Sequence, residues 1–598
     1  MFYPQIEENN NSRSLINAWY GYNHTYRTNP GEFFDMENMS TELFPVGSVR
    51  KVRCKLTDLD DESMRGIIQV DNDVYVLYDR YLWNLSTDVQ TDLEDIMGDD
   101  WDSEQTLLMM GSYLVMFPLN AYINLNDLED RGRMESKFTC PTGKEITFTP
   151  CNYDGSSLDN LTISDISPQG AKHGDHWLCT NEGEEGTYYY DGYDSMWKPL
   201  ATSYIKIGIP GVNLSDYFEE GDAVFLNSRI SEINNGSVIQ KIENDYIVVI
   251  GFMKKLTYTD YTSTSWTLEI ERKLPTLDYV CTCNNRVWGC HYGIENGEVV
   301  NEIYCSKLGD FKNWYVYQGL STDSFAITVG DMGAFTGCIA FEGNPYFFKE
   351  RVCYRMYGKI PSEFQIVDKH LEGVQRGSSK SLCIVDNAIF YKGINNVIAF
   401  DGANPTVVSA ALGNEMYFDG IAGANNNKYY LYCKTDRNKG NIFVYDTLTG
   451  LWTKESKEDF IQFTQSVEGQ LYAITKDNVY GLGSKNNAIY LRDERVDEEW
   501  TSWYAETGEM GYEYPDYKYV SRITLRACVP SRSEIEVLIS YDDRPYDAVG
   551  VMRGHDDIGS QSLAFNPFRC DHFKIMLKGH GEVRLYSLAM TTEYGSEE

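Results

Sequence analysis

Apolar and polar positions along this chain follow a unit that recurs with loose spacing. Most copies contain an apolar strand, a tight turn of Asp, Asn or Gly, an aromatic strand, a second polar turn and a third strand. Copies occupy residues 67–85, 339–358, 382–402, 423–446 and 466–483. A strand–turn unit repeated in this way is typical of β-propeller blades, and we therefore predict that fold. A generic β-sandwich built from hairpins is the alternative.

The residues in the turns and strands favour the same interpretation. Asp71, Asn72 and Asp73 separate two strands, and so do Glu468 and Gly469. Asn and Gly tolerate the positive φ that tight hairpins need. In residues 74–78 (VYVLY) both faces of the strand are apolar and carry good β-formers. A strand of this kind suits a blade that is packed between two neighbouring blades.

The repeat is interrupted, and the interruptions predict the domains. Residues 1–58 form a non-repetitive arm or clasp, and 59–135 carry two blade-like units, the second at 105–125. Residues 136–273 lose the pattern and predict an inserted small β-domain that resembles a small β-barrel or an SH3-like hairpin set. The blade pattern returns over 274–488, which gives about six to seven blades in all. Residues 489–598 contain long alternating strands and predict a C-terminal β-sandwich of jelly-roll-like shape, so the whole fold class is all-β.

Composition narrows the function. The chain has 598 residues, which is too many for one ordinary core, and a formal net charge of −37. No stretch rich in Lys and Arg stands out, which argues against sequence-specific nucleic-acid binding. An acidic wall can still let DNA pass, because it repels the phosphates and does not hold them.

Targeting features are also missing from the sequence. We expect no membrane span, because no window of about 18 consecutive apolar residues occurs. We expect no signal peptide either, because residues 1–14 (MFYPQIEENNNSRS) lack a basic start and an apolar core. The 14 cysteines form no compact framework and are expected to be reduced and structural.

One cluster of soft ligands invites a zinc hypothesis. Cys281, Cys283, Cys290 and His291 lie close together in the sequence CTCNNRVWGCH. The spacing lacks the usual two-to-four-residue gap with a second matching pair. We therefore favour the alternative, a blade hairpin with buried cysteines.

Two further groups hold polar side chains. His173, Asp175 and His176 can bind a metal or exchange protons, but a polar surface turn is the favoured interpretation. The group at 569–572 (RCDH) is interpreted as a structural corner, in which Arg and Asp pair and His bonds a neighbouring strand.

Catalytic motifs are missing. The sequence has no G-x-S-x-G, P-loop or H-E-x-x-H motif, and none of the repeated S-x-D-x-G-x-T-W turns of sialidases. We therefore expect no enzyme activity, no cofactor and no metal. A propeller glycoside hydrolase is the enzyme alternative, with a pair of carboxylates as its required feature.

The N-terminal segment carries a family resemblance. Its pattern D-M-x-N-x-S…P…R-K contains Asp35, Met36, Asn38, Ser40, Pro45, Arg50 and Lys51. This pattern resembles the opening of virion proteins of tailed bacteriophages and prophages. Residues 308–358 and 394–413 are similar to the tail-nozzle and tail-stabilisation proteins of the same family, through LGDFKNW, DSFA and FDGANP. The resemblance covers about 15–60 and 275–485.

The resemblance implies a structural protein of a short phage tail. Such proteins form a ring, often six-fold, through which the genomic DNA leaves without specific contacts. The implied partners are further copies of the chain in a hexamer and the neighbouring tail or adaptor proteins. The implied location is the virion tail, assembled in the host cytoplasm. The candidate subunit-contact residues are Trp19, Tyr20, Phe33, Phe34, Asp35, Met36, Arg50 and Lys51.

Two alternatives remain open at the level of sequence. The first is a carbohydrate-binding adhesin of a phage tail, whose C-terminal sandwich contacts glycans through Trp500, Trp503 and Tyr504. In the other interpretation these aromatic residues pack at a domain junction. The second alternative is the propeller glycoside hydrolase.

Overall fold

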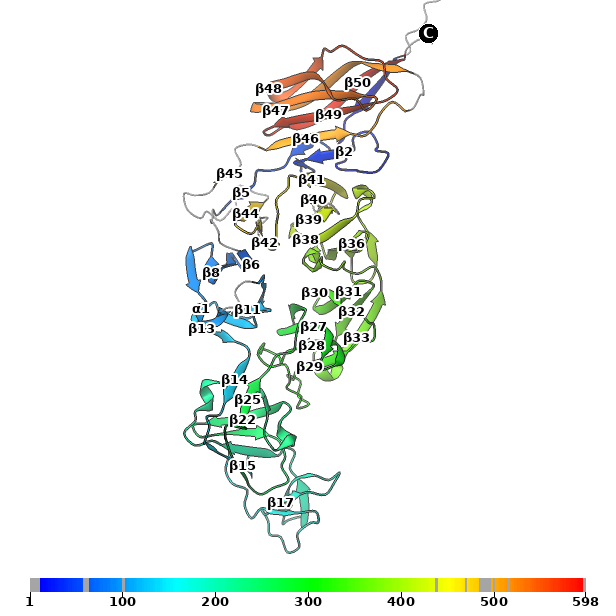
Figure 1. Ribbon diagram of the computed structural model, residues 1–598. Coiled ribbons are helices and arrows are strands. Elements are labelled where there is room, and N and C mark those ends of the chain that lie inside the picture. Colours follow the sequence, from blue (N-terminus) through cyan, green and yellow to red (C-terminus); the bar gives the residue numbers. More distant parts are fainter. Residues whose placement is uncertain are drawn as a thin grey trace, which may run out of the picture.

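A computed structural model describes residues 11–56, 64–98, 103–435, 439–467, 470–482, 496–497, 501–512 and 517–594. In these residues the chain is nearly all β, and its parts follow one another along one long axis (Figure 1). A sandwich lies at one end, a propeller in the middle and an inserted domain at the other end.

The described part of the propeller contains seven sheets, numbered here as blades 1–7. Blades 1 and 2 contain β6 (Met64–Val70), β7 (Asp73–Tyr78), β8 (Tyr81–Asn84), β9 (Val89–Asp92), β10 (Thr106–Met110), β11 (Tyr113–Phe117), β12 (Ala121–Asn124) and β13 (Asp127–Arg133), with α1 (Glu94–Met97) between them. Blades 3 and 4 contain β26 (Tyr279–Cys283), β27 (Arg286–Glu295), β28 (Glu298–Cys305), β29 (Phe325–Thr328), β30 (Phe335–Phe341), β31 (Asn344–Lys349), β32 (Val352–Tyr357) and β33 (Gln365–His370), with η3 (Pro361–Glu363) before β33.

The remaining blades follow the same plan. Blade 5 contains η4 (Ser379–Ser381), β34 (Cys383–Val385), β35 (Ala388–Lys392), β36 (Val397–Phe400), β37 (Pro405–Val407) and η5 (Ala410–Leu412). Blade 6 contains β38 (Tyr417–Asn425), β39 (Lys428–Thr435), β40 (Gly440–Asp446) and β41 (Leu451–Glu455). Blade 7 contains β42 (Gln462–Val467), β43 (Gln470–Ile474), β44 (Val479–Leu482), β5 (Cys54–Lys55) and β45 (Val496–Asp497).

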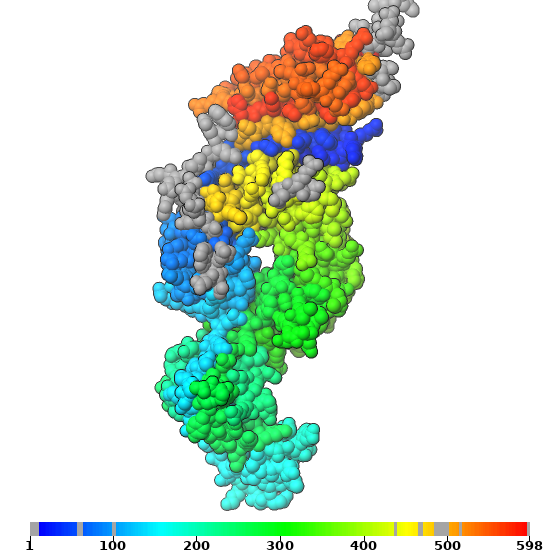
Figure 2. All heavy atoms as spheres, viewed as in Figure 1, coloured from blue at the N-terminus to red at the C-terminus, as the bar shows by residue number. Residues whose placement is uncertain are grey.

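The ring of blades is closed by residues from both parts of the chain. The first strands of successive blades pack side by side, and β42 of blade 7 packs against β6 of blade 1. In addition, β5 pairs with β44, so that residues 54–55 extend the sheet formed by residues 462–482. Figure 2 shows an opening near the centre of this ring. Closure joins distant residues and holds the first and last blades together.

The predicted turns and tight interblade packing explain why this sequence forms blades. Asp71 has a φ of 52° in the turn between β6 and β7, which Asp tolerates. Val74 and Val76 are completely buried. Gly423 of β38 lies so close to β42 that a Cβ atom there would stand 2.7 Å from the Cβ atom of Phe463. A larger residue at this position would separate the two strands.

The insertion between blades 2 and 3 contains an eight-stranded sheet. In spatial order its strands are β14 (Ser136–Thr139), β25 (Glu269–Arg272), β21 (Ala223–Leu226), β22 (Ser237–Glu243), β23 (Tyr246–Ile250), β20 (Tyr204–Gly208), β15 (Glu145–Cys151) and β24 (Tyr258–Tyr261), with η1 (Leu214–Asp216) and η2 (Ser231–Ile233) in its loops. It has its own apolar core. A buried ion pair between Arg272 and Asp222, and a hydrogen bond of 2.9 Å from Asn313 Nδ2 to Asp222, join it to blade 3.

A second, smaller sheet lies at the far end of the insertion (Figure 1). Its strands are β16 (Thr162–Ser164), β17 (His176–Cys179), β18 (Gly186–Asp191) and β19 (Met196–Pro199). Trp177 packs against Tyr188 and Trp197 with ring centroids 4.9 and 5.7 Å apart. We call residues 152–203 the tip.

The C-terminal sandwich is one sheet folded on itself around β47 (Lys518–Tyr541) and β48 (Asp547–Leu563). The first half of β47 pairs with β50 (Arg584–Tyr594), and its second half pairs with β49 (Phe573–His580). N-terminal strands complete the sheet: β1 (Asn11–Ile16), β2 (Phe33–Glu37), β3 (Met39–Ser40) and β4 (Gly47–Val49), together with β46 (Ser502–Thr507).

Over the residues that it describes, the structure confirms the fold class that the sequence predicts: a nearly all-β chain with a propeller of seven blades, an inserted β-domain and a C-terminal β-sandwich. Among the described residues, no helix has the length and apolar character that a transmembrane crossing requires.

Candidate functional site

Residues 17–53, named here the seam segment, lie between the propeller and the sandwich. On one side β2 pairs with β46 and β4 pairs with β50, so the segment belongs to the sandwich sheet. On the other side its backbone bonds to blade 6, from the Tyr22 N–H to the Trp452 carbonyl (2.7 Å) and from the Asn38 N–H to the Lys454 carbonyl (2.8 Å). The segment therefore joins the two domains through its own backbone.

Asn38 is a junction of hydrogen bonds in this segment. It is 4% exposed and has a φ of 62°, a conformation that Asn adopts more easily than most residues. Its Nδ2 donates to the Ser502 carbonyl (2.7 Å), while its Oδ1 accepts from Arg50 Nε (2.7 Å) and from the Ser456 N–H (2.9 Å). One side chain thus bonds to the sandwich, to the propeller and to the seam segment itself.

Asp35 connects the same two domains through its two carboxylate oxygens. Lys454 Nζ, from blade 6, donates to its Oδ1 (2.8 Å), and the Tyr504 hydroxyl, from the sandwich, donates to its Oδ2 (2.9 Å). Burial raises the pKa of Tyr504, and the negative charge of Asp35 adds to this rise. The Tyr504 hydroxyl therefore stays protonated and available as a donor.

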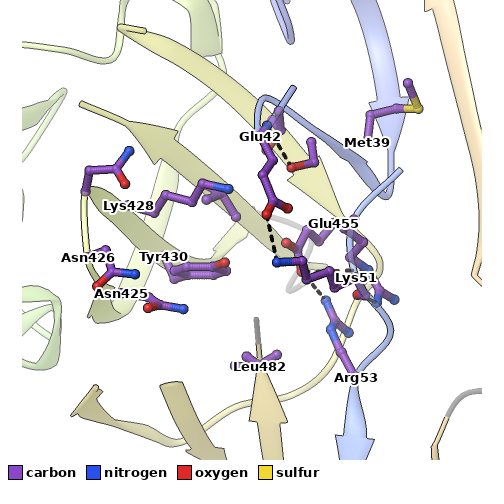
Figure 3. A pocket seen from close by; sticks show the side chains of 15 residues that line it. Met39, Glu42, Lys51, Arg53, Asn425, Asn426, Lys428, Tyr430, Glu455 and Leu482 are labelled. Carbon is purple, nitrogen blue, oxygen red and sulfur yellow. Dashed lines mark hydrogen bonds and ion pairs between the residues drawn. The ribbon is translucent and has the colours of Figure 1, made fainter. Parts of the chain in front are cut away.

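Two arginines of the segment share one buried carboxylate. Arg53 Nη2 lies 2.9 Å from Glu455 Oε2, and Arg50 Nε lies 3.8 Å from the same oxygen. A cavity of about 330 Å³ lies beside them, and Lys51 pairs with Glu42 at its edge (2.7 Å; Figure 3). Because these guanidinium groups are almost completely buried, their contacts fix the segment against blade 6.

Aromatic packing completes the seam. Trp19 stacks on Phe33 with ring centroids 5.2 Å apart, and its Nε1 donates to the Leu585 carbonyl (2.9 Å). These rings belong to one apolar core that also contains Val385 and Tyr429 of the propeller and many residues of the sandwich. The two domains therefore share a core.

The predicted subunit-contact residues have different environments in the structure. The side chains that are buried inside this chain are Trp19, Phe33, Met36 and Arg50. For these four the structure gives an intramolecular role that the sequence did not reveal, because the core that they join also contains residues from distant parts of the propeller and the sandwich.

The other candidates are more accessible. Phe34 and Asp35 are partly buried, whereas Tyr20 is 43% exposed and Lys51 has an exposed side chain. Contact with another subunit stays a prediction for these residues.

A second cavity, of about 540 Å³, lies on the blade 6 side of the seam. The Tyr417 hydroxyl donates to Glu415 Oε2 (3.0 Å), and Tyr22 and Tyr417 bond through their hydroxyls. Burial raises the pKa of Tyr22, and the charges of Asp35 and Glu415 raise it further. Two carboxylates therefore act on one phenol in a cavity that is lined mainly by polar and charged side chains. No pattern in the sequence marks this group, since its members come from separate regions of the chain.

The structure favours the buried-hairpin interpretation of the cysteine group. Cys281 and Cys283 lie on β26 and Cys290 on β27, and all three are buried. A hydrogen bond with Cys338, followed by burial, raises the pKa of Cys281. His291 Nδ1 lies 3.0 Å from Asp278 Oδ1. The thiols are therefore protonated at neutral pH, and the imidazole bonds a neighbouring loop.

The tip group is a turn whose side chains bond to its own loops. Gly192 N–H donates to His173 Nδ1 (3.1 Å), and His176 Nδ1 lies 3.1 Å from the Asp159 carbonyl. Asp175 accepts from the Lys172 N–H (2.7 Å). Hydrogen bonding to Lys172 lowers the pKa of Asp175.

The RCDH group forms a charged corner of the sandwich. His572 Nδ1 lies 3.2 Å from Asp571 and its Nε2 lies 3.3 Å from Asp543. Lys574 Nζ lies 2.9 Å from Asp543 and 3.4 Å from Glu509. The bond from His572 reaches the turn between β47 and β48, as a structural corner requires.

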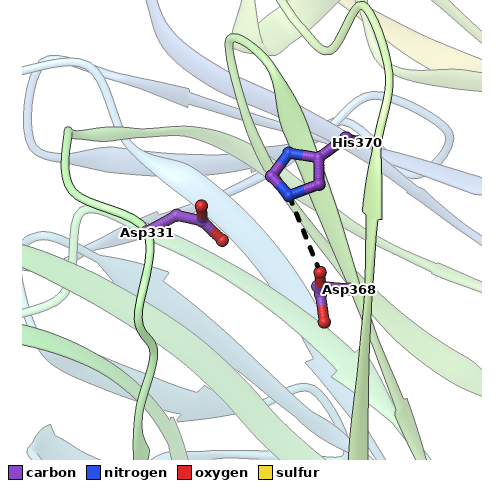
Figure 4. A group of neighbouring side chains, drawn as sticks. All are labelled: Asp331, Asp368 and His370. Atoms are coloured by element: carbon purple, nitrogen blue, oxygen red, sulfur yellow. Dashed lines mark ion pairs between the residues drawn. The ribbon is translucent and has the colours of Figure 1, made fainter.

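The described residues include two groups whose ligand atoms lie within 4.8 Å of one another. One is Glu509, Asp543 and His572, where the Lys574 ammonium already supplies a positive charge. The other is Asp331, Asp368 and His370 (Figure 4), in which the Tyr354 hydroxyl donates to Asp331 (2.7 Å). The Asp-x-His spacing on β33 is visible in the sequence, but Asp331 comes from a separate loop.

Two of the three aromatic residues proposed to contact glycans in an adhesin lie at the domain junction. Trp503 is 3% exposed in the shared core and Tyr504 bonds to Asp35. Trp500 lies outside the described residues. The two described residues thus pack at the domain junction.

Comparison with known proteins gives no family. No protein-family model and no curated protein matches the chain. Similar solved structures include an exo-β-1,3-galactanase of Phanerochaete chrysosporium, with 9% identity, 52% of this chain and 95% of that chain covered, and a TM-score of 0.22. A family 43 arabinoxylan arabinofuranohydrolase of Bacillus subtilis has 11% identity, coverage of 53% and 95%, and a TM-score of 0.19. The protein U3-55K has 8% identity, coverage of 72% and 98%, and a TM-score of 0.29.

This finding corrects the expectation that the chain is not an enzyme. Glycoside hydrolases recur among the similar structures, so the missing sequence motifs do not exclude enzyme activity. The low TM-scores give no argument for a particular activity or substrate.

Proposed function

We propose that this chain is an assembly subunit of a short bacteriophage tail, which forms a ring around the path of the DNA. The observation that carries the proposal is the architecture of the seam. The positions of the phage-like pattern, above all Asp35, Asn38 and Arg50, make the contacts that join propeller and sandwich. Related subunits with the same architecture are expected to share the residues that build the junction of their two domains.

The shape and charge of the chain support this proposal. Sandwich, propeller and insertion lie in line, which suits an elongated subunit that packs beside its copies (Figures 1 and 2). A net charge of −37 suits a lumen that DNA crosses without adhering. Ring closure requires heterologous contacts, in which one surface meets a different surface of the next copy.

Native mass spectrometry of the full chain over a concentration series tests the proposal. A closed oligomer of defined size, six copies by the family resemblance, is the expected result. The proposal would be contradicted by a chain that stays monomeric at the highest concentration, both alone and with the purified neighbouring tail proteins.

A second candidate is glycoside hydrolysis, which the 540 Å³ cavity favours. Asp35 and Glu415 both line this cavity, and retaining and inverting hydrolases both require a carboxylate pair. Release of reducing sugar from defined polysaccharides, lost in Glu415→Gln, would establish this function. Asp35 also holds the seam, so Glu415 is the better residue to change.

A further inference from the structure

The cavity of about 330 Å³ is lined by residues of blade 6, blade 7 and the seam segment. One hairpin of blade 6 supplies three of its polar side chains: Asn425 on β38 lies opposite Lys428 on β39, and Tyr430 follows two positions later. Side chains alternate along a strand, and opposite residues of an antiparallel pair share a face, so these three stand on one face of the hairpin. Figure 3 shows them on one side of the cavity, across from Lys51 and Arg53.

Two of these polar side chains are buried at the cavity. Asn425 and Tyr430 are each 7% exposed, and Asn425 Oδ1 has no hydrogen-bond partner in the described part of the chain. By rotation of its side chain, an Asn amide can turn either its oxygen or its NH₂ group toward a ligand. Burial raises the pKa of Tyr430, so its hydroxyl keeps its proton and can donate. A buried polar atom without a partner is costly, and a ligand in the cavity would remove that cost.

The charges at the cavity favour an anion. Of the described residues that line it, four are cationic and two carry carboxylates. Glu42 pairs with Lys51 and Glu455 pairs with Arg53, so both carboxylates are already engaged. Over the residues that the structure describes, no ion pair engages Lys428. An excess of cations around one cavity stands out in a chain with a net charge of −37.

We propose that this cavity binds the phosphate group of a small molecule. The ammonium of Lys428, the amide of Asn425 and the hydroxyl of Tyr430 all donate hydrogen bonds, and a phosphate offers several charged oxygens that accept them. The volume lies in the range of small-molecule sites and leaves room beside the phosphate for the rest of the ligand. A bound ligand contacts blade 6 and the seam segment together, and it therefore strengthens the junction of propeller and sandwich.

Isothermal titration calorimetry of the full chain in phosphate-free buffer tests the site with three probes: orthophosphate, pyrophosphate and ADP. At least one probe should bind at one site per chain. Lys428→Gln and Tyr430→Phe should each raise the dissociation constant at least tenfold, because each removes a hydrogen bond to a charged group. Lys359→Gln and Tyr357→Phe make the same changes at exposed positions of blade 4, and these matched controls should bind like the wild type.

The outcomes are distinct from those that test the ring, because none of them depends on the oligomeric state. The probe that binds most tightly separates the two sources of phosphate: orthophosphate indicates the free ion, whereas pyrophosphate or ADP indicates a larger phosphate compound. Binding of no probe overturns the proposal. A probe that binds both cavity variants as tightly as the wild type also overturns it, because the site then lies elsewhere. Unchanged thermal unfolding of the variants without ligand confirms that they fold.

Discussion

At the scale of single residues, the seam depends on side chains that serve partners from distant parts of the chain. The phage-like pattern marks Asp35, Asn38 and Arg50 in the sequence, but it does not reveal what they bond. Asn38 bonds Ser456 and Ser502, which lie more than 400 residues further along the chain. A local pattern contains no information about such partners, so the sequence favoured contact with another subunit.

We expect Asn38→Ala to lower the free energy of unfolding by about 2–4 kcal/mol, because it removes an acceptor of the buried Arg50 guanidinium and places Ala at positive φ. Chemical denaturation gives the value. Asn38→Gly removes the same hydrogen bonds but tolerates the φ, so it should be less destabilising than Ala. Equal stability of wild type and Ala variant would contradict the role of Asn38 as a junction.

Lys392 gives a pH-dependent prediction. It is 2% exposed, and burial lowers its pKa from 10.5 to about 8. Between pH 8 and 10.5 the unfolded chain keeps this proton and the folded chain loses it, so the contribution of Lys392 makes folding more favourable as pH rises. The gain is about 3 kcal/mol at most.

The measurement is the difference in unfolding free energy between wild type and Lys392→Met, followed from pH 7 to 10. Both proteins contain the cysteines and tyrosines that titrate in the same pH range, so the difference in unfolding free energy reports on Lys392. As pH rises above 8, the wild type should become more stable relative to the variant. A difference that is independent of pH would contradict the burial of a charged Lys392.

At the scale of elements, the propeller was predictable because a strand–turn unit repeats. In each copy the spacing of the repeat, the residues in its turns and the apolar faces of its strands all indicate the same blade. When such local features agree with the global fold, the sequence specifies that fold. The addition of β5 as a strand of blade 7 was not predictable, since its two residues are too few to show a strand pattern in the sequence. The β5–β44 pairing forms only when the ring closes.

The approach of β38 to β42 makes Gly423 the most direct test of blade packing. Gly423→Ala should lower the unfolding free energy by about 1–3 kcal/mol, because the added Cβ meets Phe463 and separates the first strands of blades 6 and 7. Gly330→Ala is the matched control, since a Cβ there meets no atom within 4 Å. Denaturation of both variants by urea gives the comparison. Equal stability of the two variants would show that the blades tolerate more space between them.

At the scale of the whole molecule, the sequence located the insertion but not its division into two bodies. The blade pattern stops before 136 and returns after 273, which marks an insertion. The tip contains only short strands and an aromatic cluster. In the sequence, neither feature distinguishes the tip from the larger sheet. Because Cys151 of β15 pairs with Tyr204 of β20, the chain leaves and re-enters the larger sheet at adjacent positions.

The tip should therefore be dispensable for folding. Replacement of residues 152–203 by Asn-Gly joins two paired strands through a tight hairpin turn. The shortened chain should unfold with the same midpoint for the propeller and sandwich as the full chain. An insoluble or unfolded product would contradict the independence of the tip.

The ring is the central claim, and electron microscopy of the purified full chain tests it most directly. Two-dimensional class averages should show closed rings of elongated subunits with one cyclic symmetry. Averages that show single elongated particles at every concentration, with or without the neighbouring tail proteins, would contradict the claim.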